Sequence, residues 1–450
     1  MSYLQQQHNG NEFSGTQDTV SDLSLFSANA ASSQTHNSPA SLLSKPTTVE
    51  ATGLPPTLLM DLLIKHLYVQ QVATLESLSE SIRLPGRLLQ TLLADAKQMM
   101  WVENRSATNQ ARFSLSGSGK AQAEKALQHS GYVGAAPVPL NDYQAMVNAQ
   151  SHRNTQVTSG LMALKLAGES FESDALEAMG MALNSTKPVL LYGLPGTGKS
   201  YLCRQLIRVF DDEIFQPVAI EVNNQIIQLF DPQVHHVSQR TSDAPADSRY
   251  QKIKRPLIVT GGELTLDMLE INYDTTRQLY KAPLQMKANN GVLLLDDLGR
   301  QQVSPSALFN RWIIPLEEHK DYLSLTNGTH FEVPFELVML FSTNLNPADL
   351  VDDAFLRRLG YKIQMRPLTR EKYSALWHRV SKTFGLDCDP QTLDYLVSHY
   401  HQPESKPFLP CYPRDLLSIV KDATRFNELP PIVTPELLDD AWRHYFVTAM

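Results

Sequence analysis

The spacing of apolar residues divides the first third of the chain into a polar tail and a helical segment. Residues 1–52 are rich in Gln, Asn, Ser and Thr, and their few apolar residues are scattered. Such a composition cannot bury enough apolar surface to offset the entropy lost on ordering, so we expect a disordered tail. From Pro55 onward, apolar residues recur at helical spacing in three successive segments, which contain Leu63, Leu78 and Leu92.

Two short strands are expected after these three helices. Residues 101–103 and 112–115 have strand character and flank a polar tip at 104–110, and a further helix is expected over 118–129. This order of elements resembles a winged helix. We therefore expect a small winged-helix-like α+β domain at 53–130.

Winged-helix domains often read DNA through their third helix, which here would present Arg87, Gln90, Thr91 and Lys97. Residues 51–150 carry eight Lys and Arg against seven Asp and Glu, a net charge of +1 without a basic stripe. Because duplex binding depends on neutralising phosphates, this balance favours a protein-docking or structural role and leaves DNA contact as the weaker alternative.

The segment 131–157 is punctuated by Gly and Pro and is expected to be a linker strapped along the next domain. Beyond it, we expect an α/β nucleotide-binding domain with a parallel sheet at 158–366, followed by the helical lid at 367–450 that the family resemblance given below implies. The α/β prediction rests first on a phosphate-binding loop that follows an apolar strand at 188–192 and precedes a helix. The loop consists of Gly193, Leu194, Pro195, Gly196, Thr197, Gly198, Lys199 and Ser200.

Each residue type in this loop can contribute to binding phosphates. The glycines allow backbone conformations that aim successive N–H groups at phosphates. Lys199 can reach the β- and γ-phosphates, and the Ser200 hydroxyl can ligate Mg²⁺. Tyr201 follows directly and is counted among the expected nucleotide-binding residues. The loop therefore predicts that the chain binds a nucleoside triphosphate with Mg²⁺.

A second buried strand, 292–295, ends in Asp296 and Asp297. Ligands of open α/β sheets bind at the carboxyl ends of the strands, so these acids are expected close to the phosphate loop. Asp296 would reach the Mg²⁺ water shell, and Asp297 would polarise the attacking water.

With the loop and the acids in place, the chain resembles the AAA+ ATPase superfamily over about residues 160–450, which implies ATP as the nucleotide. A further buried strand at 337–342 leads to Asn344, which matches the sensor 1 position and, by the resemblance, positions the attacking water. Arg414, at the start of a helix in the lid, resembles the sensor 2 arginine and would contact the γ-phosphate.

Residues 354–358 look like the arginine-finger segment of the same family. The resemblance implies that a guanidinium from this segment enters the site of a neighbouring subunit. Arginine suits this role because it stays charged and its planar fork can stabilise the transferring phosphoryl group. Arg358 is favoured as the finger, and Arg357 is the alternative.

Alternating runs within 322–333 meet at Asn327-Gly328, the strongest short-range signal for a β-hairpin. A hairpin before sensor 1 marks the AAA+ branch that includes MoxR-like ATPases and magnesium-chelatase subunits, whose members commonly remodel proteins or assist cofactor and metal insertion. This chain departs from the MoxR pattern in its second acid, which is Asp297 rather than Glu, in its N-terminal winged helix, and in a polar piece at 238–250 that we expect to be a mobile loop. It is placed near that branch.

Composition adds mainly exclusions. The 450 residues carry a net charge of −8, from 39 Lys and Arg against 47 Asp and Glu, which argues against a general polyanion binder. The sequence lacks both a long apolar run and a signal-peptide pattern, so we expect a cytoplasmic protein without a membrane span. Cys203, Cys388 and Cys411 lie far apart, which makes disulfides and a zinc site unexpected.

These features lead to one main hypothesis and two alternatives. The main hypothesis is a Mg²⁺-dependent AAA+ ATPase that forms a homo-oligomeric ring, expected to be a hexamer, and remodels a protein client docked through its N-terminal domain. The first alternative is a DNA-associated regulator or loader that uses its winged helix and an ATPase switch. The second is a nucleotide-binding scaffold with little turnover.

Overall fold

The computed structural model describes residues 39–105, 111–185, 187–238, 246–350 and 353–446. Three of the expected features therefore fall wholly or partly outside the described residues. They are most of the N-terminal tail, the wing tip at 106–110 and the centre of the polar piece, 239–245.

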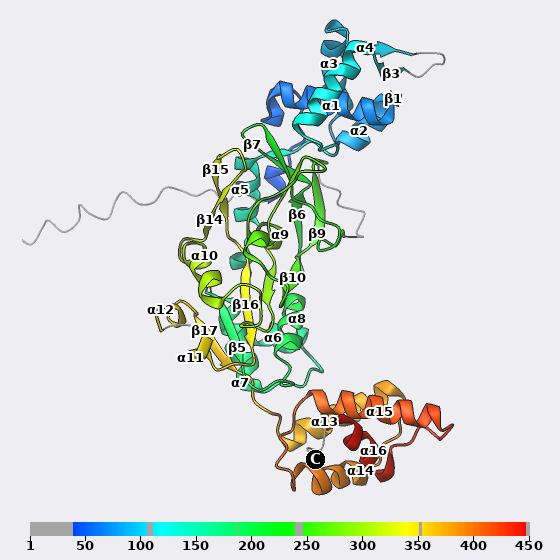
Figure 1. Cartoon of the computed structure of the whole chain (residues 1–450), viewed down its shortest axis with the longest axis vertical. Helices are drawn as coiled ribbons and strands as arrows, with labels where there is room; N and C mark the ends of the chain where they lie inside the picture. Colours follow the sequence, from blue (N-terminus) through cyan, green and yellow to red (C-terminus); the bar gives the residue numbers. More distant parts are fainter. Residues whose placement is uncertain (1–38, 106–110, 186, 239–245, 351–352, 447–450) are drawn as a thin grey trace, which may run out of the picture. The chain divides into compact units, whose positions relative to one another are not determined.

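A five-stranded parallel sheet forms the core of the α/β domain (Figure 1). Its strands, in the order in which they neighbour one another, are β10 (Leu257–Thr260), β13 (Val292–Leu295), β16 (Val338–Thr343), β5 (Val189–Tyr192) and β17 (Tyr361–Gln364). The predicted α/β fold class is thus confirmed. Because β16 lies between β5 and β13, whatever follows β16 lies between the phosphate loop and the two acids.

Helices cover both faces of this sheet, which explains why its strands are continuously apolar. Leu191 and Leu294 pack on one face with the side chains of three helices, whereas Leu190 and Leu293 pack on the other with two more. The first group is α6 (Ser159–Lys165), α7 (Ser173–Leu183) and α8 (Lys199–Gln205), and the second is α9 (Leu284–Ala288) and α10 (Pro305–Glu318).

A second sheet, which the sequence did not predict, takes four of its five strands from the long stretch between α8 and α9. Its order is β11 (Asn272–Asp274), β12 (Leu279–Lys281), β8 (Gln225–Gln228), β7 (Ala219–Val222) and β4 (Val138–Pro139). A two-stranded ribbon, β6 (Glu213–Pro217) with β9 (Tyr250–Lys254), lies in the same stretch between α8 and α9, which we call the insertion. The polar piece expected as a loop therefore ends at a buried tyrosine, Tyr250, which begins a strand.

The expected hairpin before sensor 1 is present. Strands β14 (Lys320–Ser324) and β15 (His330–Pro334) pair antiparallel, and the turn between them contains Asn327 and Gly328. Its buried side chains, Leu323, Phe331 and Val333, join the core of the second sheet together with Tyr143. The hairpin is thus anchored to the insertion.

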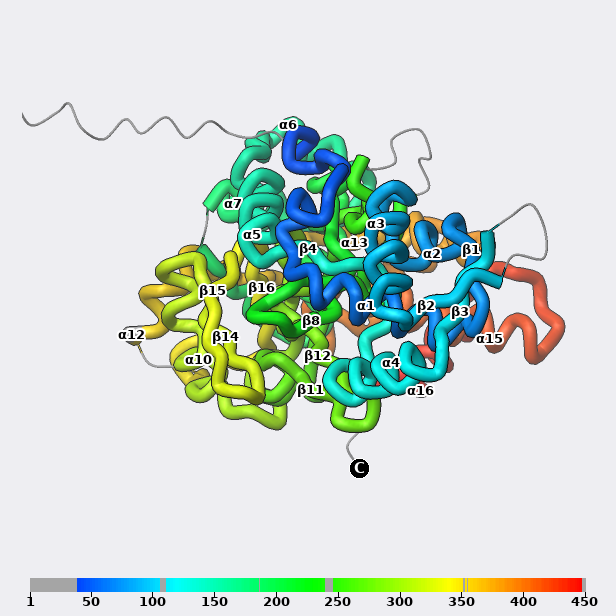
Figure 2. Tube along the Cα trace, turned by 90° about the horizontal axis from the view of Figure 1, so that it is seen from above, coloured from blue at the N-terminus to red at the C-terminus, as the bar shows by residue number. Residues whose placement is uncertain are grey.

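The N-terminal helices and strands appear in the predicted order. They are α1 (Pro56–Gln70), β1 (Ala73–Thr74), α2 (Leu75–Ile82), α3 (Gly86–Gln98), β2 (Val102–Asn104), β3 (Arg112–Leu115) and α4 (Gly117–His129). The three strands form an antiparallel sheet beside the helices (Figure 2). Thr74 caps α2 in a reciprocal capping box with Ser77. The resemblance to a winged helix stays a prediction.

Two predicted boundaries need correction. Residues 39–52, assigned to the disordered tail, contain two 3-10 turns and place Leu43 in the core of the second sheet. The segment 131–157, expected as a linker, contains β4 and helix α5 (Leu140–Ala149). Both segments are held by buried Arg249, whose guanidinium pairs with Asp247 and donates to the carbonyls of Thr52 and Pro137.

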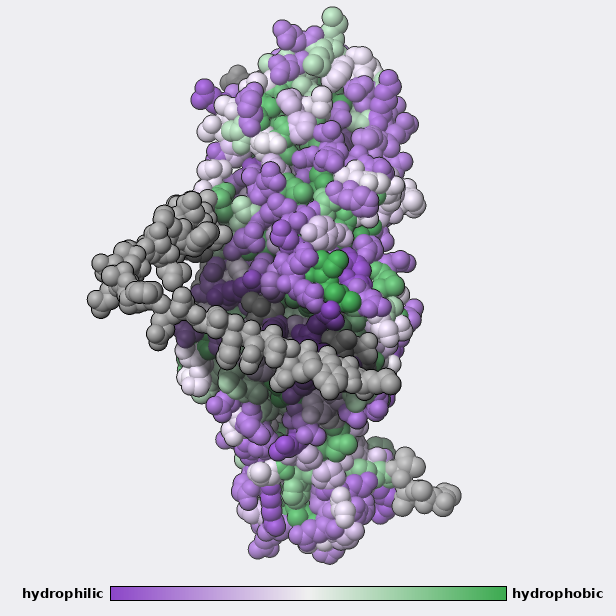
Figure 3. Space-filling model, turned by 90° about the vertical axis from the view of Figure 1, so that its left-hand side faces the viewer, coloured by the Kyte–Doolittle hydropathy of each residue, from purple (hydrophilic) through white to green (hydrophobic). Residues whose placement is uncertain are grey.

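The lid consists of α13 (Arg370–Phe384), α14 (Pro390–Leu396), a π-helical turn (Val397–His401), α15 (Cys411–Phe426) and α16 (Pro435–Tyr445). Its own apolar cluster centres on Trp377, Leu417 and Trp442. On the face shown in Figure 3, hydrophilic residues surround scattered hydrophobic ones. Within the described ranges, no helix is long and apolar enough to cross a membrane.

Acid pH is expected to destabilise the fold through His152, which is 4% exposed. Burial, then the charges of Arg153, Arg255 and His319, lower its pKa to about 4 from the ordinary 6.5. Because the unfolded chain gains the proton first, stability is lost as pH falls from 6.5 to about 4, by on the order of 3 kcal/mol. Denaturant unfolding should therefore depend less on pH in this range after His152→Phe. An unchanged pH dependence would contradict this assignment.

Candidate nucleotide-binding site

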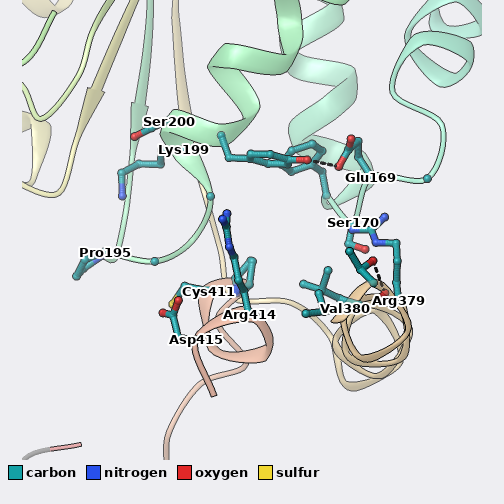
Figure 4. A pocket seen from close by; sticks show the side chains of 18 of the residues that line it. Glu169, Ser170, Pro195, Lys199, Ser200, Arg379, Val380, Cys411, Arg414 and Asp415 are labelled. Carbon is teal, nitrogen blue, oxygen red and sulfur yellow. Dashed lines mark hydrogen bonds between the residues drawn. The ribbon is translucent and has the colours of Figure 1, made fainter. Parts of the chain in front are cut away.

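A cavity of about 910 Å³ lies between the α/β domain and the lid (Figure 4). Its walls include the phosphate loop, the end of β13, the end of β16 and the start of α15. Nine of the residues predicted for the site line it, namely Pro195, Gly196, Gly198, Lys199, Ser200, Tyr201, Asp297, Asn344 and Arg414. Residues spread over 220 positions of the sequence, from Pro195 to Arg414, thus line one cavity.

The conformation of the phosphate loop accounts for its glycines. Gly193, Gly196 and Gly198 have φ values of 139°, 82° and 87°, a region that side chains strongly disfavour. A Cβ atom on Gly196 would also lie 2.5 Å from Cys411 Sγ of the lid. Thr197 is buried and its hydroxyl donates to the Leu194 carbonyl at 2.8 Å, which closes the loop from within.

Lys199 is the buried cation of the site, at 5% exposure. Its Nζ donates to the carbonyls of Gly193 and Leu194, both at 2.9 Å, and to Asn344 Oδ1 at 2.7 Å. Burial lowers the pKa of this ammonium, and the carboxylates of Asp297 and Asp296 oppose the shift. Lys199 therefore lies where it can join the phosphate loop to the residues that follow β13 and β16.

One carboxylate oxygen of Asp296 accepts hydrogen bonds from two hydroxyl groups. Ser200 Oγ donates to Asp296 Oδ1 at 2.6 Å, and Ser342 Oγ donates to the same atom. The other oxygen lies 3.8 Å from the guanidinium of Arg204. Hard oxygen ligands of this kind suit Mg²⁺, which is commonly held by one or two carboxylates plus substrate phosphates. Ser200 and Asp296 fit the predicted metal site.

Asp297 is exposed, and its Oδ1 accepts a hydrogen bond from Asn344 Nδ2 at 3.0 Å. Asn344 thus bridges Lys199 and Asp297 with the two ends of one amide. This contact is a direct result of the strand order, because β16 separates the strands that carry the loop and the acids. The arrangement can position a water between a carboxylate and a phosphate.

The lid contributes two arginines to the cavity, of which the sequence predicted one. Arg414 reaches from α15 toward the phosphate loop, whereas Arg379, on α13, lies beside Ser170 (Figure 4). The sensor 2 role of Arg414 stays a prediction. No local motif marks Arg379.

Apart from Tyr201, the part of the cavity away from the phosphate loop was not predicted. It is lined by residues 167–171, which connect α6 to α7, and by Leu376 and Val380 of α13. Tyr201 donates to Glu169 Oε2 at 2.9 Å, and its ring lies 5.9 Å from that of Phe171. Aromatic and aliphatic side chains in this arrangement can hold a flat apolar ring.

The predicted arginine finger lies apart from these residues. Arg358 follows α12 (Asp353–Leu356), is half-buried, and donates through Nε to Glu317 of α10 at 2.6 Å. The neighbouring Arg357 is exposed. Neither arginine lines the cavity, so the prediction that one of them acts in a neighbouring subunit stays open.

Comparisons with known proteins found similar solved structures and one family model. The chain is similar to NtrX from Brucella abortus, with 16% identity and a TM-score of 0.41 over 64% of this chain and 58% of that one. It is also similar to the RuvB Holliday junction branch migration motor of Thermotoga maritima, with 13% identity and a TM-score of 0.35 over 65% of this chain and 73% of that one. No curated protein sequence matches the chain. Residues 369–444, which form most of the lid, match the model of a domain of unknown function, DUF8689.

Proposed function

We propose that this protein is an AAA+ ATPase that hydrolyses ATP with Mg²⁺. The observation that carries the proposal is the convergence of the phosphate loop, Asp297, Asn344 and Arg414 on one cavity. Four residue types with separate roles in phosphoryl transfer come from four different segments of the chain. A glycine turn with a purely structural role would need none of these partners.

The residues divide the chemistry among themselves. Backbone N–H groups of the loop and Lys199 would hold the phosphates, and Ser200 with Asp296 would hold Mg²⁺, which supplies charge neutralisation when bound. Asp297 accepts a proton from, or orients, the attacking water, and Asn344 fixes that carboxylate. Arg414 supplies positive charge from the lid, where phosphoryl transfer places negative charge.

The direct test is Mg²⁺-dependent ATP hydrolysis by the full chain, compared with Asp297→Asn. We expect the variant to bind ATP normally, because Asn keeps the size of the side chain and can still meet Asn344. Its kcat should fall by about 100-fold, since the amide cannot take up a proton. Phosphate release and nucleotide affinity are measured separately. Equal kcat in both proteins would refute the role of Asp297, and no turnover by the parent chain would favour the scaffold alternative.

The finer part of the proposal is that ring-forming copies of the chain remodel a protein client, as MoxR-like proteins do. Two observations support a protein rather than DNA at the N-terminal helices. Helix α3 carries Arg87, Asp95 and Lys97, a net charge of only +1, which is little for a surface that binds phosphates. Two exposed methionines, Met99 at 51% and Met100 at 77%, follow the same helix. Methionines of this kind are typical of adaptable protein-binding surfaces.

An affinity experiment separates the two kinds of partner. The Asp297→Asn chain, saturated with ATP, should retain client proteins from a lysate that the ADP-bound chain releases. Fluorescence anisotropy with a labelled DNA duplex at low salt tests the alternative. Tight, salt-dependent duplex binding without ATP-dependent protein capture would replace the remodelling hypothesis with the DNA-associated one. Light scattering with and without ATP measures the molar mass of the assembly, and so tests whether copies of the chain form a ring.

A further inference from the structure

We propose that Gln301 is a positioning residue for ATP hydrolysis, which holds the backbone of the two acids so that the Asp297 carboxylate faces the phosphates. This inference rests on the proposed ATPase function and extends it to a residue outside the sequence motifs. Gln301 follows the acids in the loop before α10 and is half-buried.

The side-chain amide of Gln301 closes the turn after β13 with three hydrogen bonds. Its Nε2 donates to the carbonyl oxygen of Asp296 at 2.9 Å and to that of Asp297 at 3.2 Å. Its Oε1 accepts from the backbone N–H of Gly299 at 2.8 Å. Both ends of one amide are used, and every partner is main chain within the turn that carries the acids.

This turn needs external support because Asp297 has a φ of 52°. A non-glycine residue in the left-handed region costs roughly 1–3 kcal/mol and persists only where surrounding contacts define it. The Leu298 N–H also donates to the Ser342 carbonyl at 2.7 Å. Strand β16 and Gln301 thus each hydrogen-bond the backbone of the turn.

The shortness of the second acid makes backbone placement matter more. An aspartate has one rotatable side-chain bond fewer than the glutamate usual at this position, so its carboxylate has less freedom to compensate for a displaced backbone. Asn344 contacts only one carboxylate oxygen, Oδ1. Backbone control through Gln301 therefore sets where the Asp297 carboxylate lies.

The test compares steady-state ATP hydrolysis by the full-length parent, Gln301→Ala, Gln301→Glu and the control Gln302→Ala. Gln302 is the exposed neighbour, and its side chain has no hydrogen bond among the described residues. We expect kcat to fall by about 10- to 100-fold in both Gln301 variants, with KM for ATP and the thermal midpoint close to parent values. Glu keeps the size and the acceptor but loses the donors, so it should not rescue. A parent-like kcat in Gln301→Ala, or an equal loss in Gln302→Ala, overturns the inference.

A double-mutant cycle shows whether Gln301 acts through Asp297. If it does, Gln301→Ala should cost little further activity in the Asp297→Asn background. Full additivity of the two losses would overturn the inference. The proposed function fails separately, if the parent chain itself does not hydrolyse ATP.

Discussion

Replacing Lys199 with Ala is expected to lower kcat/KM for ATP by at least about a hundredfold, because the site loses its buried cation. The ammonium lies within hydrogen-bond distance of two loop carbonyls and of Asn344, so the change removes both phosphate contact and a link across the site. ATP hydrolysis and ATP binding by the full chain are the measurements.

Lys187→Ala provides the matched control. Lys187 is exposed and lies just before β5, the strand that leads into the phosphate loop. It does not line the cavity. It should leave kcat/KM unchanged. Parent-like hydrolysis by Lys199→Ala would show that the cavity is not the ATP site, whatever its shape.

Replacing Arg358 with Ala is expected to lower kcat by about 10³- to 10⁵-fold, which is the usual contribution of an arginine finger. The loss should leave ATP affinity nearly intact, since Arg358 does not line the cavity of its own molecule. Mixing Arg358→Ala with Lys199→Ala should restore part of the activity, because some interfaces then combine an intact site with an intact arginine. No recovery on mixing would argue against a site shared between subunits.

Arg357→Ala, assayed alone and in the same mixtures, decides between the two arginines. Arg358 is engaged with Glu317 within its own molecule, so it must exchange that partner to act on a neighbour. Arg357 is exposed and faces no such exchange. If Arg357→Ala shows the large loss and the recovery on mixing, the arginine finger is Arg357.

Much of the site was predictable because its chemistry lies at the ends of apolar strands. Each buried strand of a parallel sheet is a continuous apolar run, and the residues after it must emerge at the same edge. The strand pattern therefore placed Lys199 and the two acids near one another, and the resemblance added Asn344. The strand order then explains why Asn344 lies between Lys199 and Asp297.

The second sheet escaped prediction for an equally physical reason. Its strands are two to four residues long, several are half polar, and two of its four pairings, β4 with β7 and β12 with β8, join segments far apart in sequence. Short strands without a strong periodicity carry no local signal. Arg379 also lacks a local motif, and its place in the cavity follows from the packing of the lid.

Three apolar side chains of the insertion, Ala219, Ile226 and Leu279, belong to the same buried cluster as helices α1 to α4. A fragment cut after α4 would expose that shared surface on both pieces, at a cost of about 25 cal/mol for each Å² of apolar area returned to water. The N-terminal helices are therefore not expected to fold as an independent domain. During evolution, a change in their inner surface must be matched by a change inside the α/β domain, so the two are expected to be inherited together.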